Sequence, residues 1–324
     1  MKKNMIKSIM PPFIKAYDNP ATGGITITEV DAAIPEFWAN VALGALKANT
    51  VMAQLVNRDY SSEVATRGDV VNIVRRGALT VNDKKTGKQI TLQTPSNSKI
   101  PVTLDKHKEI SWLIEDTASA KAIQDAVNYV QDAAKALGEQ IDRDLLSLYS
   151  TLTLQAGSAN SALSVNSILD AREKLNIAKA PVAGRYFVIS PQDETALLKL
   201  EEFTKAGWSD ENQVALREAT LGKKYGFTFV MDQQVITTSS GAQRHNIAFH
   251  KDAFALVTRP LPAPPAGSGA ISSSLEVDGI SVRVTRSYSQ KDGGMLWTLD
   301  VLYGIAGLQN STHGVHVLSG NNPG

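Results

Sequence analysis

The sequence predicts an α+β fold in which long strands accompany one long helix. Apolar residues recur every three or four positions over residues 117–153, which is the period of an α-helix. Residues 100–104, 110–114 and 280–303 instead alternate between apolar and polar side chains, as β-strands do. Because the two periods occupy separate blocks of the chain, α+β is the fold class that we expect.

Composition limits the classes of function. The chain has 324 residues, with 33 basic and 32 acidic side chains and a formal net charge of +1. This balance argues against a dedicated nucleic-acid binder, although a protein that only encloses nucleic acid would fit it. The absence of cysteine excludes disulfides, thiolate zinc sites and cysteine nucleophiles. No apolar run has the length of a membrane span, so no membrane partner is expected.

Residues 1–60 are expected to form an N-terminal arm. Lys7 interrupts the apolar run that a signal peptide would need, so the first ten residues indicate a basic arm of a cytoplasmic protein. Pro35 then opens a helix that buries Phe37 and Trp38, because proline suits the first helical turn. A helix this apolar needs a partner surface in its own chain or in a neighbouring one.

Residues 61–116 indicate extended structure around a hairpin tip. Gly87 is suited to a positive φ in the turn over residues 82–88, and Leu79 and Leu92 lie on its two sides. Few large apolar residues occur over residues 83–99, and an isolated two-stranded ribbon is only marginally stable in water. We therefore expect this loop to lie on another subunit.

The helix over residues 117–153 is the most informative segment. Roughly 35 residues at ~1.5 Å each make a rod of about 50 Å, which is longer than most globular helices. Such a rod is more consistent with a structural spine than with one wall of a compact active site. Its expected core consists of Ile123, Val127, Val130, Leu137, Ile141, Leu145 and Leu148.

The acidic side chains of this helix have two interpretations. Asp125, Asp132, Glu139, Asp142 and Asp144 are expected to form its solvated face. Alternatively, some of them meet basic residues from a neighbour's loop, which would fix register more than it would add stability. The candidate intersubunit contacts are Asp125, Asp132 and Glu139 with Arg75, Arg76, Lys84, Lys85 and Lys88.

The second half of the chain indicates a small α/β layer and a terminal hairpin. Asn166 or Ser167 is expected to cap a helix. Ser190, Pro191 and Asp193 form a strong helix start after a buried strand. Residues 280–303 indicate a long antiparallel hairpin with a glycine turn.

No chemical site emerges from the motifs. His313 and His316, and likewise His245 and His250, lack the carboxylate context of helical metal sites, so they are expected on the surface or in loops. No nucleophile elbow, Walker A motif or dinucleotide fingerprint in its strand–turn–helix context is present. We therefore predict no catalytic, cofactor-binding or metal-ligating residue. A soluble enzyme using the α/β layer over residues 185–235 would need a convergent polar site, and the sequence shows none.

The order of elements carries a resemblance to a known family. The motifs that carry it are, in order, residues 34–38 (IPEFW), 68–71 (GDVV), 249–256 (FHKDAFAL), 259–261 (RPL), 279–284 (GISVRV) and 300–304 (DVLYG). Together with the arm, loop, spine and final hairpin, they resemble the HK97-type major capsid proteins, and within that fold the coat-protein family of P22-like tailed phages. The extra insertion domain of the P22 coat protein has no counterpart here.

The resemblance implies a domain plan. Residues 1–60 would be the N-terminal arm, 61–116 the E-loop and 117–184 the spine helix with the peripheral (P) domain. Residues 185–260 would be mostly the axial (A) domain. Residues 261–324 would return to the P-domain as the terminal hairpin and C-terminal tail.

The resemblance also implies a function. Many copies would assemble in the host cytoplasm, as pentamers and hexamers, into the icosahedral capsid of a virion that encloses double-stranded DNA without reading its sequence. A scaffolding protein, a portal and decoration proteins would be possible partners. An encapsulin-type nanocompartment shares the fold and stays an alternative, which nucleic acid inside purified particles would exclude.

Overall fold

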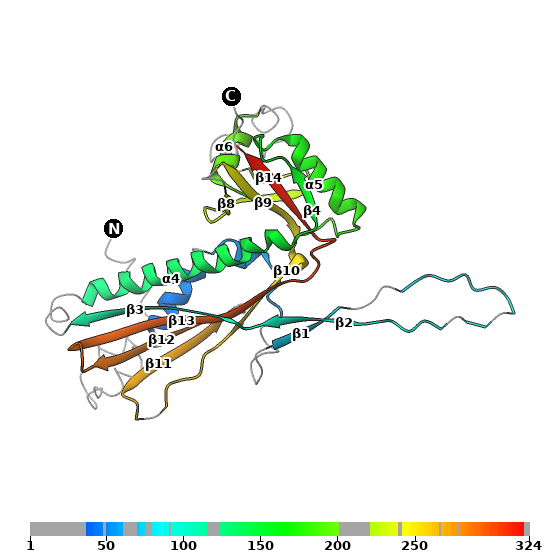
Figure 1. Cartoon of the computed structure of the whole chain (residues 1–324). Helices are drawn as coiled ribbons and strands as arrows, with labels where there is room; N and C mark the ends of the chain where they lie inside the picture. Colours follow the sequence, from blue (N-terminus) through cyan, green and yellow to red (C-terminus); the bar gives the residue numbers. More distant parts are fainter. Residues whose placement is uncertain are drawn as a thin grey trace, which may run out of the picture.

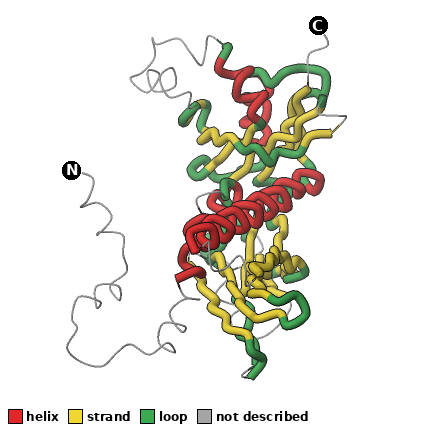
Figure 2. Tube along the Cα trace, turned by 90° about the vertical axis from the view of Figure 1, so that its left-hand side faces the viewer, coloured by secondary structure: helices red, strands yellow, loops and turns green. Residues whose placement is uncertain are grey.

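Two β-sheets lie on opposite sides of a long helix, α4 (Ile123–Leu146), in the computed structural model of the chain (Figures 1 and 2). The structure describes residues 37–47, 50–60, 70–75, 79–87, 89–90, 92–115, 123–200, 221–238, 242–265, 267–277 and 279–320. Residues 1–36 of the expected N-terminal arm, with Pro35, lie outside these ranges. Residues 37–47 are helical, as expected. Trp38 is buried, but Phe37 is 37% exposed, so its expected burial was wrong.

The five-stranded sheet lies against one side of α4. It consists of β10 (Phe254–Arg259), β13 (Gly294–Gly307), β12 (Ile280–Ser289), β11 (Ala270–Val277) and β3 (Lys106–Glu115). The expected terminal hairpin is confirmed, because β12 and β13 pair antiparallel from Arg283–Asp300 to Ser289–Gly294. The alternating residues Trp297, Leu299 and Val301 of β13 are buried.

The strand β3 lies in this sheet, although we expected its residues in the extended loop. It pairs with β13 along all of its 10 residues, from Lys106–Tyr303 to Glu115–Gly294. Ile110, Trp112 and Ile114 pack against the main core, which a free loop could not provide. Residues 106–115, which we expected in the loop, therefore belong to the five-stranded sheet.

The seven-stranded sheet lies on the other side of α4. Its strands are β4 (Leu154–Gly157), β14 (Gly314–Gly320), β9 (Gln243–His250), β5 (Arg185–Ile189), β7 (Phe227–Met231), β6 (Lys223–Lys224) and β8 (Thr237–Thr238). A second core joins this sheet to α5 (Val165–Ile177) and α6 (Pro191–Leu198).

Strand pairing also groups other segments that the expected domain plan keeps apart. β4 and α5 belong with the seven-stranded sheet, although we placed them with the spine helix. β14, which we placed in a C-terminal tail, pairs with both β4 and β9 (red in Figure 1). Conversely β10 pairs with β13 in the five-stranded sheet. Each sheet contains hydrogen bonds between strands that are distant in the sequence. A plan that divides the chain into consecutive residue ranges therefore cannot assign every strand to its sheet.

The helix caps match the expectations in one case of two. Ser190 caps α6 with Pro191 in the first turn, and its Oγ accepts a hydrogen bond from the backbone N–H of Asp193. The cap of α5 is Ser164, whose Oγ accepts from the N–H of Ser167, so Asn166 and Ser167 were the wrong choices. Both caps satisfy backbone N–H groups that have no partner within the helix.

The spine helix is shorter than its sequence pattern. α4 has 24 residues, which makes a rod of about 36 Å, and a 3₁₀ helix, η4 (Ser147–Thr151), follows it. The hydroxyls of Ser147, Ser150 and Thr151 each donate to the carbonyl oxygen three residues earlier. Hydroxyl groups that bind these carbonyl oxygens compete with the backbone N–H groups of a regular α-helix. Here they occur where the α-helix changes to the tighter 3₁₀ helix. The expected α-helical end at residue 153 was therefore wrong.

One core crosses from sheet to sheet through α4. Val130, Leu137, Ile141 and Leu145 are buried, and Leu148 is partly buried against the same core. The side chains of Ile123 and Val127 lie outside the described part of the chain. The core contains Leu299 and Val301 of the five-stranded sheet and also Ile247 and Phe249 of the seven-stranded sheet. α4 is therefore buried from two directions, which its single stripe of apolar residues did not reveal.

Candidate assembly surfaces

The loop between β1 (Val70–Arg75) and β2 (Ser98–Thr103), here called the β1–β2 loop (residues 76–97), is exposed at all of its described residues. β1 and β2 pair antiparallel from Val70–Thr103 to Arg75–Ser98. Beyond this pairing, the described residues of the loop form no strand or helix, and they extend far from both sheets (Figure 1). Gly87 adopts a φ of 79°, as expected for the turn.

Large apolar side chains of the β1–β2 loop are in water. Their exposed fractions are 94% for Val81, 92% for Leu92, 74% for Ile90 and 67% for Leu79. Gln93 bridges the two arms, because its Oε1 accepts from the N–H of Thr80 at 2.8 Å and its Nε2 donates to the carbonyl oxygen of Thr80. A projecting segment with four exposed apolar side chains has the character of a binding surface rather than of ordinary polar surface.

The base of the β1–β2 loop is firmly anchored. Val71, Ile73, Val102 and Leu104 are buried in a small core with residues of β10 and Leu308. A β-carbon at Gly304 of β13 would collide with the carbonyl oxygen of Thr103, so glycine permits the chain to cross β13 there. A rigid base and an exposed tip suit an arm that reaches a neighbouring molecule.

The predicted contact residues are not brought together within one chain. Lys84 and Lys85 lie in the exposed loop and Arg75 at its base, whereas Asp132 and Glu139 lie on α4. Figure 1 shows the loop pointing away from the N-terminal half of α4. Asp132 is exposed, and Glu139 is half-buried with its Oε1 4.0 Å from Nζ of Lys135. Arg76, Lys88 and the side chain of Asp125 lie outside the described residues.

Two acidic residues of α4 are not on a solvated face, which corrects our expectation. Asp142 is 1% exposed, and its two carboxylate oxygens accept from the backbone N–H groups of Val51 and Ala53 at 2.5 and 3.0 Å. Asp144 accepts from the hydroxyl of Tyr303 at 2.8 Å and lies 3.3 Å from Nζ of Lys106. These carboxylates connect elements within the subunit, so only the remaining acidic positions could face a neighbour.

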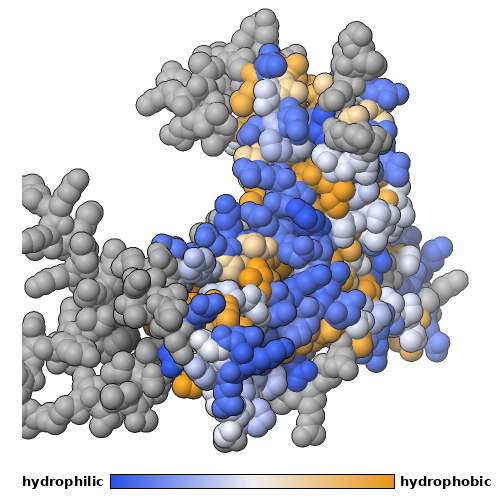
Figure 3. Space-filling view, turned by 60° about the vertical axis from the view of Figure 1, so that its left-hand side comes forward, coloured by the Kyte–Doolittle hydropathy of each residue, from blue (hydrophilic) through white to orange (hydrophobic). Residues whose placement is uncertain are grey.

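A groove separates the helix over residues 37–47 from α4. It has a volume of about 530 Å³, and its lining is formed by Asn40, Val41, Gly44, Ala45, Gln131, Asp132 and Lys135. Figure 3 shows a face of the molecule on which small hydrophobic patches are separated by broad hydrophilic areas. The groove therefore places Asp132 beside apolar side chains on an accessible surface.

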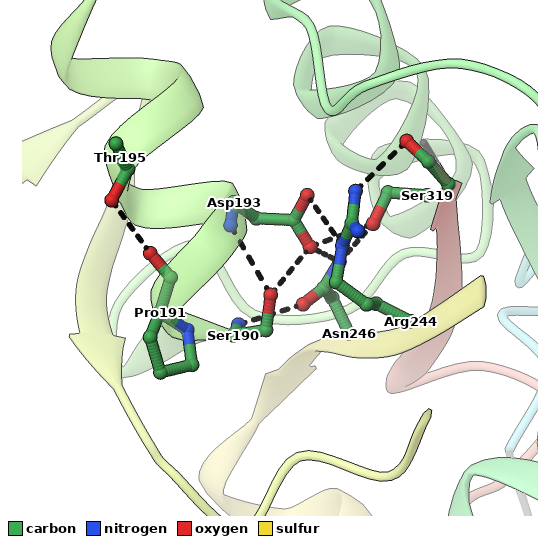
Figure 4. Close-up of polar contacts among 8 residues, drawn as sticks. Ser190, Pro191, Asp193, Thr195, Arg244, Asn246 and Ser319 are labelled. Atoms are coloured by element: carbon green, nitrogen blue, oxygen red, sulfur yellow. Dashed lines mark hydrogen bonds and ion pairs between the residues drawn. The ribbon is translucent and has the colours of Figure 1, made fainter. Parts of the chain in front are cut away.

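The densest polar cluster of the α/β layer is closed to any substrate. Oδ2 of Asp193 accepts from the hydroxyls of Ser190 and Ser319 at 2.9 and 2.6 Å and from Nδ2 of Asn246 at 2.7 Å (Figure 4). Its Oδ1 accepts from Nε of Arg244 at 3.2 Å. All five side chains are buried. The cluster therefore ties α6, β9 and β14 together, and only its Ser190–Asp193 part was visible in the sequence.

The histidines form pairs across strands, which the sequence spacing did not show. His245, His250 and His316 are buried, so the expectation of surface or loop positions was wrong for them. Nδ1 of His245 lies 2.9 Å from Nε2 of His316, and the ring of Tyr149 stacks on His245 at 4.2 Å. Burial lowers the pKa of His245, and burial with the neighbouring His245 lowers the pKa of His316 to about 4.

The described residues contain neither a cluster of metal-binding side chains nor a helix that could span a membrane. Within them, no group of three His, Cys, Asp or Glu side chains could hold a metal ion. None of the helices described is both long and apolar enough to span a bilayer. The accessible features are thus the projecting loop, the groove beside α4 and the acidic positions of α4.

The comparison that decides the family is a match to a sequence model of phage capsid proteins. It matches residues 58–259, more than half of the chain. The chain belongs to the phage capsid protein family. None of the curated proteins compared with it matches in sequence.

Solved capsid structures show the same fold. A chain of Mycobacterium phage Che8 superposes with a TM-score of 0.61 at 23% identity, covering 83% of this chain and 90% of that one. The capsid of cyanophage P-SCSP1u gives a TM-score of 0.60 at 14% identity, covering 84% and 88%. The mature capsid of bacteriophage PhiM1 gives 0.53 at 12% identity, covering 78% and 83%.

This phage capsid protein therefore has the HK97-type α+β fold that the order of its elements indicated. It is a major capsid protein that forms an icosahedral shell. The match to phage capsid proteins favours a virion shell over an encapsulin compartment. The narrower likeness to P22-type coat proteins stays a prediction.

Proposed function

We propose that the β1–β2 loop is the arm by which each subunit of this capsid protein holds its neighbour in the shell. The observation that carries the proposal is the exposure of Val81 and Leu92, at 94% and 92%, on a segment whose base is buried. Covering such side chains on an adjacent subunit contributes about 25 cal/mol per Å² of apolar area removed from water. Many small contacts of this kind, repeated around a closed shell, favour assembly over free subunits.

The charged residues of the loop orient this contact. Arg75, Lys84 and Lys85, with Arg76 and Lys88, meet the acidic positions Asp125, Asp132 and Glu139 on a neighbour's α4. Asp132 lines the groove beside the helix over residues 37–47, so an apolar loop residue and a loop lysine can be received at one place. Exposed ion pairs add little stability, but they select register and orientation.

The two sheets correspond to the two domains of the capsid fold. The five-stranded sheet with α4 forms the peripheral domain. The seven-stranded sheet with α5 and α6 forms the axial domain, which gathers around the fivefold and sixfold axes as pentamers and hexamers. The connectivity supports this division, because each sheet collects strands from distant parts of the sequence into one layer.

The shell encloses double-stranded DNA without reading its sequence, and the protein has no enzymatic role. A net charge of +1 fits enclosure rather than neutralisation of phosphates by the shell protein. Assembly takes place in the host cytoplasm, with a scaffolding protein, a portal and decoration proteins as partners. Particles purified from infected cells would contain nucleic acid; particles filled with protein cargo alone would contradict this assignment.

The arm is tested by deleting residues 82–88 from the full chain. The expected variant is soluble and folded, with wild-type far-ultraviolet circular dichroism, but yields few closed shells in negative-stain micrographs. Replacing the same seven residues by a Gly/Ser linker of equal length is the matched control, because it keeps the reach of the loop and its four exposed apolar side chains and removes only the side chains of the tip. Normal shells at normal yield from the deletion would refute the proposal.

A further inference from the structure

The C-terminal half of α4 meets the turn that follows β7. Nη2 of Arg143 donates to Oε1 of Gln234 at 2.8 Å. Ile141 and Leu145 of α4 share a core with Val235 and Ile247 of the seven-stranded sheet side. The helix meets the seven-stranded sheet side at this contact, and η4 adds a second one through the stacking of Tyr149 on His245.

Two buried carboxylates lie at this joint. Asp142 of α4 is 1% exposed and Asp232 after β7 is 3% exposed. Oδ1 of Asp232 accepts from the N–H of Gln234 at 2.7 Å, but its Oδ2 is buried and has no hydrogen-bond partner among the described residues. An unpartnered buried carboxylate oxygen is unfavourable, and far more so when the group is ionised.

No cation in the described part of the chain pairs with either carboxylate. From α4, Glu139 adds a further negative charge beside Asp232, and Arg143 is directed to the amide of Gln234. Glu139 in turn faces Lys135 at 4.0 Å. From the short helix α2 (Met52–Leu55) and its preceding residue, only backbone N–H groups reach Asp142. The local charges are therefore mainly negative.

We propose that Asp142 and Asp232 make the contact between α4 and the seven-stranded sheet a proton-controlled joint. With these carboxylates protonated, the joint is closed as the structure shows it. Ionisation of both places two uncompensated charges in a dry contact, and separation of α4 from the turn over residues 232–236 relieves them by hydration. The joint is therefore a place where pH changes how firmly the two sheets are held together.

The direction of the effect follows from the electrostatics. Burial is the main cause that raises the pKa of Asp142, to about 7, and burial also raises the pKa of Asp232. A carboxyl group with a raised pKa stabilises the closed joint below its ordinary pKa and loses that contribution as pH rises through the raised value. From Asp142 alone, opening increases roughly tenfold between pH 6 and pH 8.

Amide hydrogen exchange of the unassembled full-length subunit tests the joint. The amides of Ala53, Asp232 and Gln234 are compared at pH 6 and pH 8, after correction for the intrinsic chemical rate. About a tenfold larger opening constant at pH 8 is expected in the wild type. Asp142→Asn, which keeps the shape but cannot ionise, should reduce that ratio to below about threefold, whereas Asp132→Asn on the exposed side of α4 should leave it unchanged.

Two outcomes would contradict the proposal of a proton-controlled joint. One is an opening constant in the wild type that does not change between the two pH values. The other is a ratio that Asp142→Asn leaves as large as in the wild type. If Asp142→Asn does not fold, Asp232→Asn is measured in the same way, because it removes the negative charge beside Asp142 and should lower the ratio.

Discussion

Asp142 on α4 accepts a hydrogen bond at 2.5 Å from the backbone N–H of Val51, which lies 91 residues earlier in the chain. Because Val51 supplies no side-chain cap of its own, the carboxylate of the spine helix takes that role for α2. The contact fixes the segment after the helix over residues 37–47 against the spine. The helical pattern predicted that Asp142 faces solvent, but its side chain holds α2 against α4 by hydrogen bonds within the subunit.

Removing this cap should destabilise the subunit. Asp142→Ala leaves the N–H groups of Val51 and Ala53 buried without acceptors, so we expect a loss of about 1–3 kcal/mol in the free energy of unfolding at pH 6. Urea denaturation of the unassembled subunit measures it. Asp142→Asn keeps an acceptor oxygen and should lose less; equal losses for the two variants would show that the cap is not the cause.

The buried pair of Asp193 and Arg244 should be sensitive to loss of one partner. Arg244→Ala leaves the Asp193 carboxylate buried without its cation, and it also removes the donor to the carbonyl oxygen of Gly320. We expect a loss of roughly 3–5 kcal/mol in unfolding free energy.

A control lies on the same helix. Thr195→Ala removes only a hydroxyl that donates to the carbonyl oxygen of Pro191 on the exposed side of α6. It should change the unfolding free energy by less than about 0.5 kcal/mol. If Arg244→Ala and Thr195→Ala lower the unfolding free energy by similar amounts, the buried cluster around Asp193 does not contribute more to stability than an exposed hydrogen bond.

Acid should weaken the contact between η4 and the seven-stranded sheet. The pKa of His316 is lowered to about 4, so its contribution is present above the ordinary value near 6.5 and is lost as pH falls through 4. Over that interval we expect a loss of roughly 3 kcal/mol in unfolding free energy from this group.

His316→Phe tests the assignment, because it keeps a ring beside Tyr149 and cannot be protonated. Its unfolding free energy should fall less steeply between pH 6.5 and pH 4 than that of the wild type. Tyr149 fluorescence is masked by tryptophan, so the measurement is urea denaturation followed by circular dichroism. A slope identical to the wild type would assign the acid sensitivity elsewhere.

The proposed charge contact between subunits can be tested by reversal. Lys84→Glu with Lys85→Glu should lower the yield of closed shells severalfold, because like charges then face Asp132 and Glu139 of the neighbour. Adding Asp132→Lys and Glu139→Lys should restore part of the yield.

Particle counts from electron micrographs measure both sets of variants. Lys84, Lys85 and Asp132 are exposed, so their substitutions should change the stability of the unassembled subunit by less than about 0.5 kcal/mol. Glu139 is half-buried and faces Lys135, so the stability of the second set is measured separately. If the second set of variants folds but restores no shells, the loop lysines do not contact the acidic residues of a neighbour's α4.

The sequence determined the elements that have a strong local pattern. The alternation over residues 280–303 defined the β12–β13 hairpin, and Ser190 with Pro191 defined the start of α6. The four-residue and three-residue spacing defined α4, although not its C-terminal end, where side-chain hydroxyls compete for the backbone carbonyls. The order of these elements was enough to indicate the capsid fold, because order survives errors in individual boundaries.

Only the tertiary structure decided which distant segments meet. β3 lies in the five-stranded sheet and β14 in the seven-stranded sheet, although we expected them in the loop and in the C-terminal tail. His245 and His316 meet through the pairing of β9 with β14. Asp142 and Asp144 are hydrogen-bonded within the subunit because the start of α2 packs on α4 at Asp142 and β13 packs on it at Asp144. A periodic pattern gives the direction of a side chain relative to its own helix, whereas burial depends on what packs there, and that is set by long-range strand pairing.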